Sequence, residues 1–187
     1  MTGRFEIIRT PLEGLMLLRR RRMGDERGWL ERLFCAEELK DAGWSWPVTQ
    51  MNRTLTARKG SVRGMHFQHP PHEEAKLVTC LRGEVLDVAV DLRENSPTFR
   101  RWHGEILSDG NAASLLIPPG FAHGFQTLTD NVEMLYVHSA SYVPEAEDGI
   151  RADDPTIAIA WPLDITERSE RDRNFPLLAE REEREKR

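Results

Sequence analysis

The sequence predicts an all-β protein, folded as a sandwich or a barrel. From residue 48 to Trp161, short apolar runs alternate with turn signals, and no helical period appears over that stretch. Regular short strands at this spacing are typical of sandwiches and barrels. The length of 187 residues fits one domain that can bury most of its apolar surface.

The N-terminal part is expected to hold two strands and one helix. Strands are predicted at residues 5–10 and 14–19, where the runs are β-branched or rich in leucine. Residues 35–43 (CAEELKDAG) combine good helix formers with a terminal glycine, and they predict the one internal helix. The other expected strands are 48–54, 62–68, 76–81, 85–92, 104–107, 114–117, 122–128, 133–138 and 157–161.

The run EVLDVAVDLR (84–93) alternates most clearly between two kinds of side chain. One face is aliphatic, whereas Asp87 and Asp91 lie on the other face with Ala89 between them. A strand with acidic residues on its second face borders either solvent or a polar cavity.

The C-terminal segment 177–187 (LLAEREEREKR) is almost wholly charged. This composition predicts a frayed helix or a disordered tail that carries no chemistry. We therefore expect a single domain over residues 1–176, followed by this charged tail.

The charge balance limits the classes of partner. Lys plus Arg number 26 and Asp plus Glu number 31, which gives a formal net charge of -5. Nucleic acids and anionic membranes need a broad basic surface, so both are excluded as expected partners. A small anionic ligand held by a few local arginines remains compatible with this balance. The one dense basic run, 19–22, is interpreted as a solvated strand end.

Cysteine spacing and the N-terminus indicate a cytoplasmic protein. Cys35 and Cys80 match neither a zinc nor a redox spacing, and Cys80 lies in an apolar run that predicts a small core residue. The N-terminal stretch MTGRFEIIRT lacks the apolar region of a signal peptide. The longest apolar stretches are far too short to span a membrane.

Three stretches concentrate reactive side chains. In SVRGMHFQHPPHEEAKLV (61–78), His69 and His72 flank two prolines, so we expect them in an exposed loop. His66 lies within an apolar strand and is either a hydrogen-bonded core residue or a site residue that points into a cavity. The stretches IPPGFAHGF (117–125) and EMLYVHSASY (133–142) carry His123 and Tyr136, which alone are consistent with a packed histidine and a core tyrosine.

These stretches also resemble the paired motifs of cupin barrels, so a metal site must be considered. Metal-binding cupins use a His-x-His pair, whose imidazoles share one face of a strand because the side-chain period is two. Here two residues separate His66 from His69, and Gln68 stands where the second ligand would be. Without the facing pair, three or four ligands are hard to assemble, and we expect no metal.

Several longer motifs resemble those of the dTDP-4-dehydrorhamnose 3,5-epimerases. They run in order from about Arg4 to Pro176 and comprise GDERG (24–28), SVRGMHFQ (61–68), AKLV (75–78), GEVLDVAVDLRENSPTF (83–99), PPGFAHGF (118–125) and DDPTIAIAWPL (153–163). The resemblance implies a cupin-type jelly-roll barrel with a few short helices, usually a homodimer. It also implies a single epimerase domain that uses neither a metal nor an organic cofactor.

The same resemblance implies roles for individual residues. The histidine of the RGxHxQ segment, here His66, is the general base, and Asp172 in Ser-Glu-Arg-Asp (169–172) is its partner. Tyr136 is the proton donor, and Lys76 faces the 4-keto oxygen. The implied substrate-binding residues are Gln50, Asn52, Arg63, His123, Glu147 and Arg171, together with Arg27, which reaches the nucleotide of the neighbouring subunit.

This chain departs from the family pattern at a few positions. Arg32 stands where some members carry a glutamate that helps to hold the nucleotide, and Met51 replaces the aspartate of a Gln-Asp-Asn segment. Arg171 replaces a lysine that precedes Asp172 in other members.

The implied reaction explains why these residue types are needed. A hydrogen on a carbon beside a ketone can be removed because the charge spreads onto the carbonyl oxygen as an enolate. Epimerisation therefore needs a base on one face, an acid on the other and a cation at the oxygen. A neutral histidine paired with a carboxylate, a protonated tyrosine and a lysine meet these needs. The expected function is epimerisation at C3 and/or C5 of a dTDP-4-keto-6-deoxyhexose.

The spacing of Arg63 and His66 needs an explanation if both serve one site. They are three positions apart, so a regular strand would point them to opposite faces. Either the strand starts after Arg63, or Gly64 marks a bulge. We favour the strand that starts late.

Other functions remain open at this stage. A 3- or 5-monoepimerase or a 3,4-ketoisomerase on a related nucleotide sugar would use a similar site, although Tyr136 favours an epimerase. A non-catalytic cupin that binds a sugar would not need a base that faces an acid. A metal-dependent cupin oxygenase is the third alternative.

Overall fold

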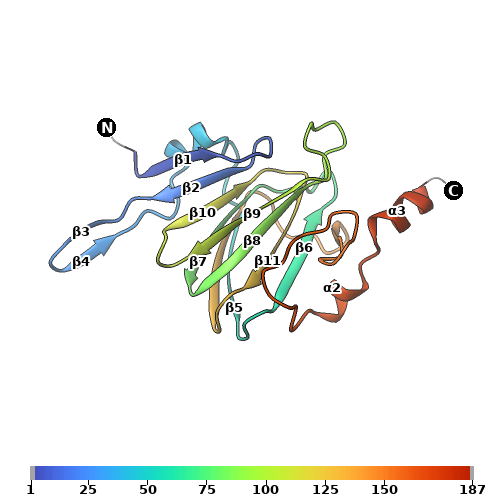
Figure 1. Ribbon diagram of the computed structural model, residues 1–187. Coiled ribbons are helices and arrows are strands. Elements are labelled where there is room, and N and C mark those ends of the chain that lie inside the picture. Colours follow the sequence, from blue (N-terminus) through green and yellow to red (C-terminus); the bar gives the residue numbers. More distant parts are fainter. Residues whose placement is uncertain (1–2, 186–187) are drawn as a thin grey trace.

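The computed structural model describes residues 3–185, and most of its strands form two antiparallel sheets that face each other (Figure 1). The six-stranded sheet has the order β1 (Phe5–Arg9), β2 (Met16–Arg20), β10 (Ala113–Ile117), β7 (Lys76–Arg82), β12 (Val132–His138) and β5 (Gln50–Thr56). The five-stranded sheet has the order β13 (Glu147–Gly149), β6 (Val62–Gln68), β11 (Phe121–Thr127), β8 (Glu84–Asp91) and β9 (Trp102–Ser108). The all-β prediction is confirmed.

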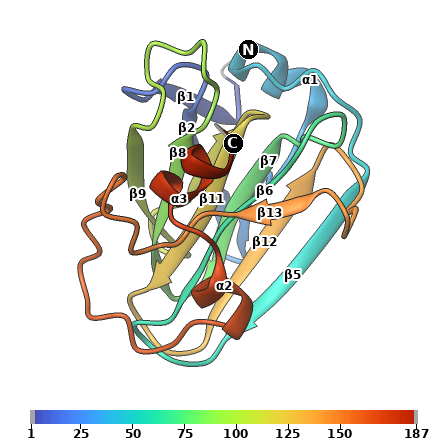
Figure 2. The same ribbon diagram turned by 90° about the vertical axis from the view of Figure 1, so that its right-hand side faces the viewer.

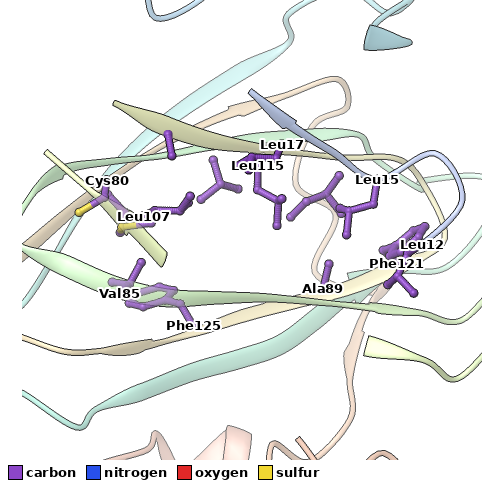
Figure 3. Close-up of a cluster of buried hydrophobic side chains, with 14 of the residues drawn as sticks. Leu12, Leu15, Leu17, Cys80, Val85, Ala89, Leu107, Leu115, Phe121 and Phe125 are labelled. Atoms are coloured by element: carbon purple, nitrogen blue, oxygen red, sulfur yellow. The ribbon is translucent and has the colours of Figure 1, made fainter. Parts of the chain in front are cut away.

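An apolar core fills one part of the space between the two sheets. Leu17 and Leu115 of the six-stranded sheet pack in one cluster with Val85 and Phe125 of the five-stranded sheet (Figure 3). Cys80 belongs to the same cluster and is 1% exposed, which confirms it as a core residue. Burial raises the pKa of its thiol to about 11, so the thiol stays protonated.

Strand β8 has two buried faces, and this determines where its acids point. Its aliphatic face is covered from outside, because Val88 and Val90 pack against Ile150, Ile157 and Leu178. Figure 2 shows the C-terminal segment, with helices α2 (Glu170–Asn174) and α3 (Leu178–Glu185), in front of the five-stranded sheet. The other face of β8 therefore points into the barrel.

The inward face of β8 carries both aspartates, which are fully buried. Asp87 lies behind the wall of a polar cavity, because it is 2.8 Å from Nε2 of His123, which lines that cavity. Asp91 instead accepts hydrogen bonds from Arg93, Ser96 and Thr98, and these hold its pKa at about 2 although burial alone would raise it.

One expectation about the C-terminal part is wrong. Residues 157–161 form no strand: their side chains cover the outer face of β8, and Trp161 donates to the carbonyl oxygen of Ala152. The segment expected to be a tail contains α3, which docks on the barrel through buried Leu178 and through Arg181, 2.6 Å from Asp148, and its last residues, 186–187, lie outside the described part. An apolar run can thus cover a sheet without joining its hydrogen-bond ladder.

The N-terminal elements agree more closely with the sequence. The expected helix consists of α1 (Ala36–Leu39) and a 3₁₀ turn (Lys40–Ala42), and it ends at Gly43 in the left-handed conformation, with φ of 98°. A hairpin of β3 (Met23–Asp25) and β4 (Gly28–Leu30) was not expected. It extends away from the barrel (Figure 1).

The basic run 19–22 is only partly solvated, which corrects the interpretation of a solvated strand end. Arg20 is 5% exposed, lies 3.3 Å from Glu31 and donates to the carbonyl oxygen of Ala113. No helix within residues 3–185 is long and apolar enough to cross a membrane.

Candidate active site

A cavity of about 1010 Å³ lies between the two sheets. Strands β5, β7 and β12 of the six-stranded sheet and β6 and β11 of the five-stranded sheet supply its walls, and residues 167–172 also line it. All of the predicted site residues except Arg27 line this cavity: Gln50, Asn52, Arg63, His66, Lys76, His123, Tyr136, Glu147, Arg171 and Asp172.

His66 and Asp172 form a hydrogen-bonded pair in the wall of the cavity. Nε2 of His66 lies 2.9 Å from Oδ1 of Asp172, and the imidazole is partly exposed while the carboxylate is buried. Because a carboxylate accepts, this contact puts the proton on Nε2 and leaves Nδ1 as the basic nitrogen of the neutral ring. Phe175 packs edge-on against the same ring at 5.8 Å.

The start of α2 holds Asp172 in place. The side chain of Ser169 caps the helix and accepts from the Asp172 N–H at 3.0 Å, while the Gly64 N–H donates to Oδ2 of Asp172 at 3.2 Å. Burial alone would raise the pKa of Asp172, but the hydrogen bonds from His66 and Gly64 outweigh it and keep that pKa below its usual value. The partner of His66 is therefore ionised at neutral pH.

A bulge in β6 brings Arg63 and His66 to the same cavity. Opposite β11, His66 pairs with His123 while Arg63 pairs with Phe125, so β6 has one more residue than β11 between these pairs. Gly64 has a φ of 120°, and a Cβ there would lie 2.6 Å from the backbone of β11. The expectation of a late strand start is wrong because β6 begins at Val62, before Arg63.

Tyr136 lies on the opposite wall, in β12. Its ring contacts the ring of His123 edge-on at 6.1 Å, and Nε2 of His123 lies 2.8 Å from the buried carboxylate of Asp87. Burial and the charge of Asp87 raise the pKa of Tyr136 well above its usual range. The phenol therefore retains its proton over the whole neutral range.

Lys76 lines the cavity beside the backbone of His66. It is 7% exposed, and its Nζ lies 3.5 Å from the carbonyl oxygen of His66. Its ion-pair partner is Glu74, at 3.0 Å. A nearly buried ammonium group of this kind can stabilise a negative charge that develops inside the cavity.

Exposed polar groups form a second cluster near His66. Arg171 makes an ion pair with Glu147, which also accepts a hydrogen bond from the hydroxyl of Tyr142 at 2.6 Å. Burial alone would lower the pKa of Arg171, but the carboxylates of Glu147 and Asp172 raise it. The Tyr142 ring is half exposed and lines the cavity.

Arg27 lies apart from the other predicted residues. It follows Asp25 in the β3–β4 hairpin, makes an ion pair with that aspartate, and its side chain is 85% exposed. Within its own chain, Arg27 does not line the cavity.

The described part of the chain contains no group of three His, Cys, Asp or Glu side chains arranged to hold a metal ion. His69 lies outside the cavity and contacts Asp148 at 2.9 Å.

The cavity wall also contains residues that the sequence analysis did not predict, and among them are Glu74, His138 and Tyr142. The strand period of two could have indicated two of them. Glu74 lies two positions before Lys76, and His138 lies two positions after Tyr136, so each shares a face with a predicted residue.

The geometry combines a histidine paired with a carboxylate on one wall, a tyrosine on the other wall, and a lysine at the start of β7, in the same sheet as the tyrosine. This set can remove a proton beside a carbonyl group, stabilise the enolate and return a proton from the other side.

Comparisons with known proteins agree with this chemistry. A family model described as dTDP-4-dehydrorhamnose 3,5-epimerase matches residues 9–180. The chain is 41% identical over 179 residues to the dTDP-4-dehydrorhamnose 3,5-epimerase of Methanothermobacter thermautotrophicus, covering 94% of this chain and 96% of the relative.

Two solved structures are similar over most of their length and have the same cupin-type jelly roll. One is a dTDP-6-deoxy-D-glucose-3,5-epimerase from Legionella pneumophila in complex with dTDP-4-keto-L-rhamnose, with a TM-score of 0.88, 39% identity and coverage of 94% of this chain and 93% of that one. The other is a 3'-monoepimerase from Streptomyces bikiniensis in complex with dTDP-quinovose, with a TM-score of 0.87, 34% identity and coverage of 94% and 89%.

Proposed function

Because this chain belongs to the dTDP-4-dehydrorhamnose 3,5-epimerase family, we propose that it inverts C3 and C5 of a dTDP-4-keto-6-deoxyhexose. It is an enzyme of the isomerase class. The observation that carries the proposal is that a His66–Asp172 pair and Tyr136 line one cavity from opposite sheets.

The first step is removal of a proton by His66. Nδ1 takes the proton from the carbon beside the ketone, and the electron pair of the broken C–H bond moves onto the 4-keto oxygen. Asp172 stabilises the imidazolium that forms, because its carboxylate accepts the Nε2–H at 2.9 Å. The ammonium of Lys76 stabilises the enolate oxygen, so the proposed reaction needs no metal and no organic cofactor.

The second step is the return of a proton by Tyr136 to the opposite face of the carbon. The raised pKa of the phenol supports this role, because the group carries its proton at neutral pH. The C–H bond re-forms as the enolate collapses to the ketone. His66 then releases its proton to solvent, and the phenolate of Tyr136 takes one up. Two such cycles invert C3 and C5.

Charged and polar residues near the reacting centre suit a nucleotide sugar. Arg63 and Arg171 line the cavity, and a guanidinium group can pair with two diphosphate oxygens at once. Gln50, Asn52, His123 and Glu147 are the proposed contacts to the rest of the substrate. This small-molecule ligand is the expected partner, rather than a nucleic acid or a membrane.

A homodimer is part of the proposal, with Arg27 serving the site of the neighbouring subunit. Its hairpin extends from the barrel (Figure 1) and carries Trp29 and Leu30, both 61% exposed. Exposed Met51 and Leu55 lie on β5, the edge strand of the six-stranded sheet. Apolar side chains on a hairpin and an edge strand support a contact between subunits. We place this dimer in the cytoplasm.

A coupled assay tests the proposed function. Purified protein is incubated with dTDP-4-keto-6-deoxyglucose, and a 4-keto reductase specific for the inverted sugar consumes the product while reduced nicotinamide is followed. We expect turnover that depends on both enzymes. No turnover, with the 4-keto sugar recovered unchanged, would contradict the proposal.

The 3-monoepimerase is the second candidate, and one comparison favours it. The Streptomyces bikiniensis structure, which is 34% identical to this chain with a TM-score of 0.87, is a 3'-monoepimerase. NMR of the product distinguishes the two functions, because a monoepimerase inverts C3 alone.

A further inference from the structure

A second histidine–carboxylate pair lines the cavity, on the wall opposite His66. Oε2 of Glu74 lies 2.8 Å from Nδ1 of His138, and Oε1 of the same carboxylate lies 3.0 Å from Nζ of Lys76. The three side chains are only 9% to 11% exposed, and all of them line the cavity. One carboxylate thus connects the histidine to the lysine.

The backbone holds this trio in register. His138 is the last residue of β12 and pairs directly with Lys76, the first residue of β7. Just outside the pair, the Ala75 N–H donates to Oγ of Ser139 at 2.7 Å, and the Ser139 N–H donates to the carbonyl oxygen of Ala75 at 3.1 Å. The ends of two neighbouring strands therefore set the distance between the side chains.

Burial makes the shared carboxylate important for Lys76. A nearly buried ammonium group loses hydration, and a carboxylate in contact with it offsets that loss and fixes its position. Glu74 is the carboxylate in contact with Lys76 among the described residues. Burial alone would raise the pKa of Glu74, but His138 and Lys76 outweigh it and lower that pKa, so Glu74 is ionised.

His138 in turn fixes the carboxylate. Its Nδ1–H occupies one oxygen of Glu74, so Lys76 meets the other oxygen in a defined direction. The imidazole stacks on the ring of Tyr136, with centroids 6.0 Å apart and planes 22° apart. Its Nε2 lies 3.5 Å from the amide nitrogen of Asn52. The ring is therefore restrained on several sides.

We propose that Glu74 and His138 are positioning residues for the reaction: Glu74 holds the ammonium of Lys76 where the enolate oxygen forms, and His138 holds Glu74. The inference rests on the proposed function, in which Lys76 stabilises that oxygen. Neither residue needs to touch the substrate for this role, because each acts through Lys76.

A merely structural role predicts a different response to substitution. If the trio only stabilised the strand ends, an isosteric change would weaken dTDP binding along with kcat. If Glu74 acts through Lys76, kcat falls while the Kd for dTDP stays constant. The melting temperature falls in both cases, because Lys76 is left nearly buried without its ion-pair partner. The effect on kcat must also disappear once Lys76 is gone, because residues that act through one group are not additive.

Glu74→Gln keeps the shape of the side chain and removes its charge. Glu73→Gln is the matched control, since Glu73 is the exposed neighbouring acid and does not line the cavity. We expect Glu74→Gln to lower the rate of deuterium uptake at the sugar about 10- to 100-fold, as for residues that hold the ligands of a metal ion in place. The Kd of Glu74→Gln for dTDP and the exchange rate of Glu73→Gln should match those of the wild type.

Two substitutions at His138 separate its two contacts. His138→Asn retains an N–H donor for Glu74, whereas His138→Phe retains a ring against Tyr136 but no donor. We expect the Phe variant to lose rate as Glu74→Gln does and the Asn variant to keep most of it. The reverse order would show that His138 acts through Tyr136, which would overturn the inference.

The double variant Lys76→Met with Glu74→Gln completes the test. Exchange as slow as in Lys76→Met alone supports the inference. A further loss equal to that of Glu74→Gln in the wild type, or a Glu74→Gln rate within about twofold of the Glu73→Gln control, would overturn it. Absence of exchange in the wild type would instead contradict the proposed function, and the inference with it.

Discussion

Nε2 of His66 lies 2.9 Å from Oδ1 of Asp172, although 106 residues separate them in the sequence. The histidine comes from a barrel strand, and the aspartate comes from a short helix packed beside it. Since the carboxylate accepts the Nε2–H, the contact selects the tautomer in which Nδ1 is basic.

Asp172→Asn tests whether this contact matters for catalysis. The amide keeps the shape of the side chain but no longer stabilises an imidazolium, so kcat should fall by ~10² to 10⁴ with little change in KM. Steady-state kinetics measures both, and Asp41→Asn, on the exposed helix end, is the control. A kcat close to that of the control would exclude Asp172 as the partner of the base.

Tyr136→Phe should separate the two halves of the reaction. His66 can still form the enolate, but no hydroxyl returns a proton to the other face, so deuterium enters the sugar with little inversion. We expect epimerisation to fall by ~10² to 10⁴ if the hydroxyl is the acid. The melting temperature of Tyr136→Phe, compared with that of the wild type, controls for a loss of packing. Wild-type inversion by Tyr136→Phe would mean that the acid lies elsewhere.

Subunit mixing tests the placement of Arg27. Homodimers of Arg27→Ala and of His66→Asn should both be impaired, but mixed dimers contain one site with both residues intact. If Arg27 serves the neighbouring site, reassortment restores about a quarter of the wild-type rate, since about half of the dimers are mixed and each has one intact site. Light scattering establishes the dimer. A monomer with full activity, or no recovery on mixing, would contradict the proposal.

The pH dependence of stability should depend on Asp91. Its pKa is held at about 2, below the value of about 3.9 expected in the unfolded chain. A group with a depressed folded-state pKa stabilises the fold above the unfolded value, and this contribution disappears as the pH falls toward 2.

Asp91→Asn should therefore lower the free energy of unfolding by about 1 to 3 kcal/mol at pH 7. The difference from the wild type should shrink as the pH falls from about 4 to 2. Urea unfolding at several pH values measures it. A difference that stays constant over that range would show that the charge of Asp91 is not what stabilises the loop.

Periodicity and turn signals were sufficient to predict the strands of the two large sheets, except β13. They did not distinguish strand 85–92 from segment 157–161, because both are apolar runs of suitable length. Only packing distinguishes them. Strand 85–92 has a neighbouring strand on each edge, whereas segment 157–161 covers the outer face of a sheet whose strands are already hydrogen-bonded to one another. The three-residue strand β13 has too short a pattern to predict.

The site was predicted more completely than local patterns alone would allow. The pairing of His66 with Asp172 followed from the resemblance to a family, since no spacing rule connects positions 106 residues apart. The bulge at Gly64 was open to prediction from the spacing of Arg63 and His66. Glu74 was missed although it lies two positions before Lys76 and so shares a face with it, because this spacing does not show that both side chains will be buried.

Deuterium uptake by dTDP-4-keto-6-deoxyglucose tests the central claim most directly. The sugar is incubated with the wild-type protein in deuterated buffer, and proton NMR follows the signals of the hydrogens on C3 and C5. The His66→Asn variant is the comparison. We predict loss of both signals and a doubly inverted product with the wild type, and no exchange with a His66→Asn variant that still binds dTDP. Retained exchange in that folded variant, or no exchange at either carbon with the wild type, would contradict the account.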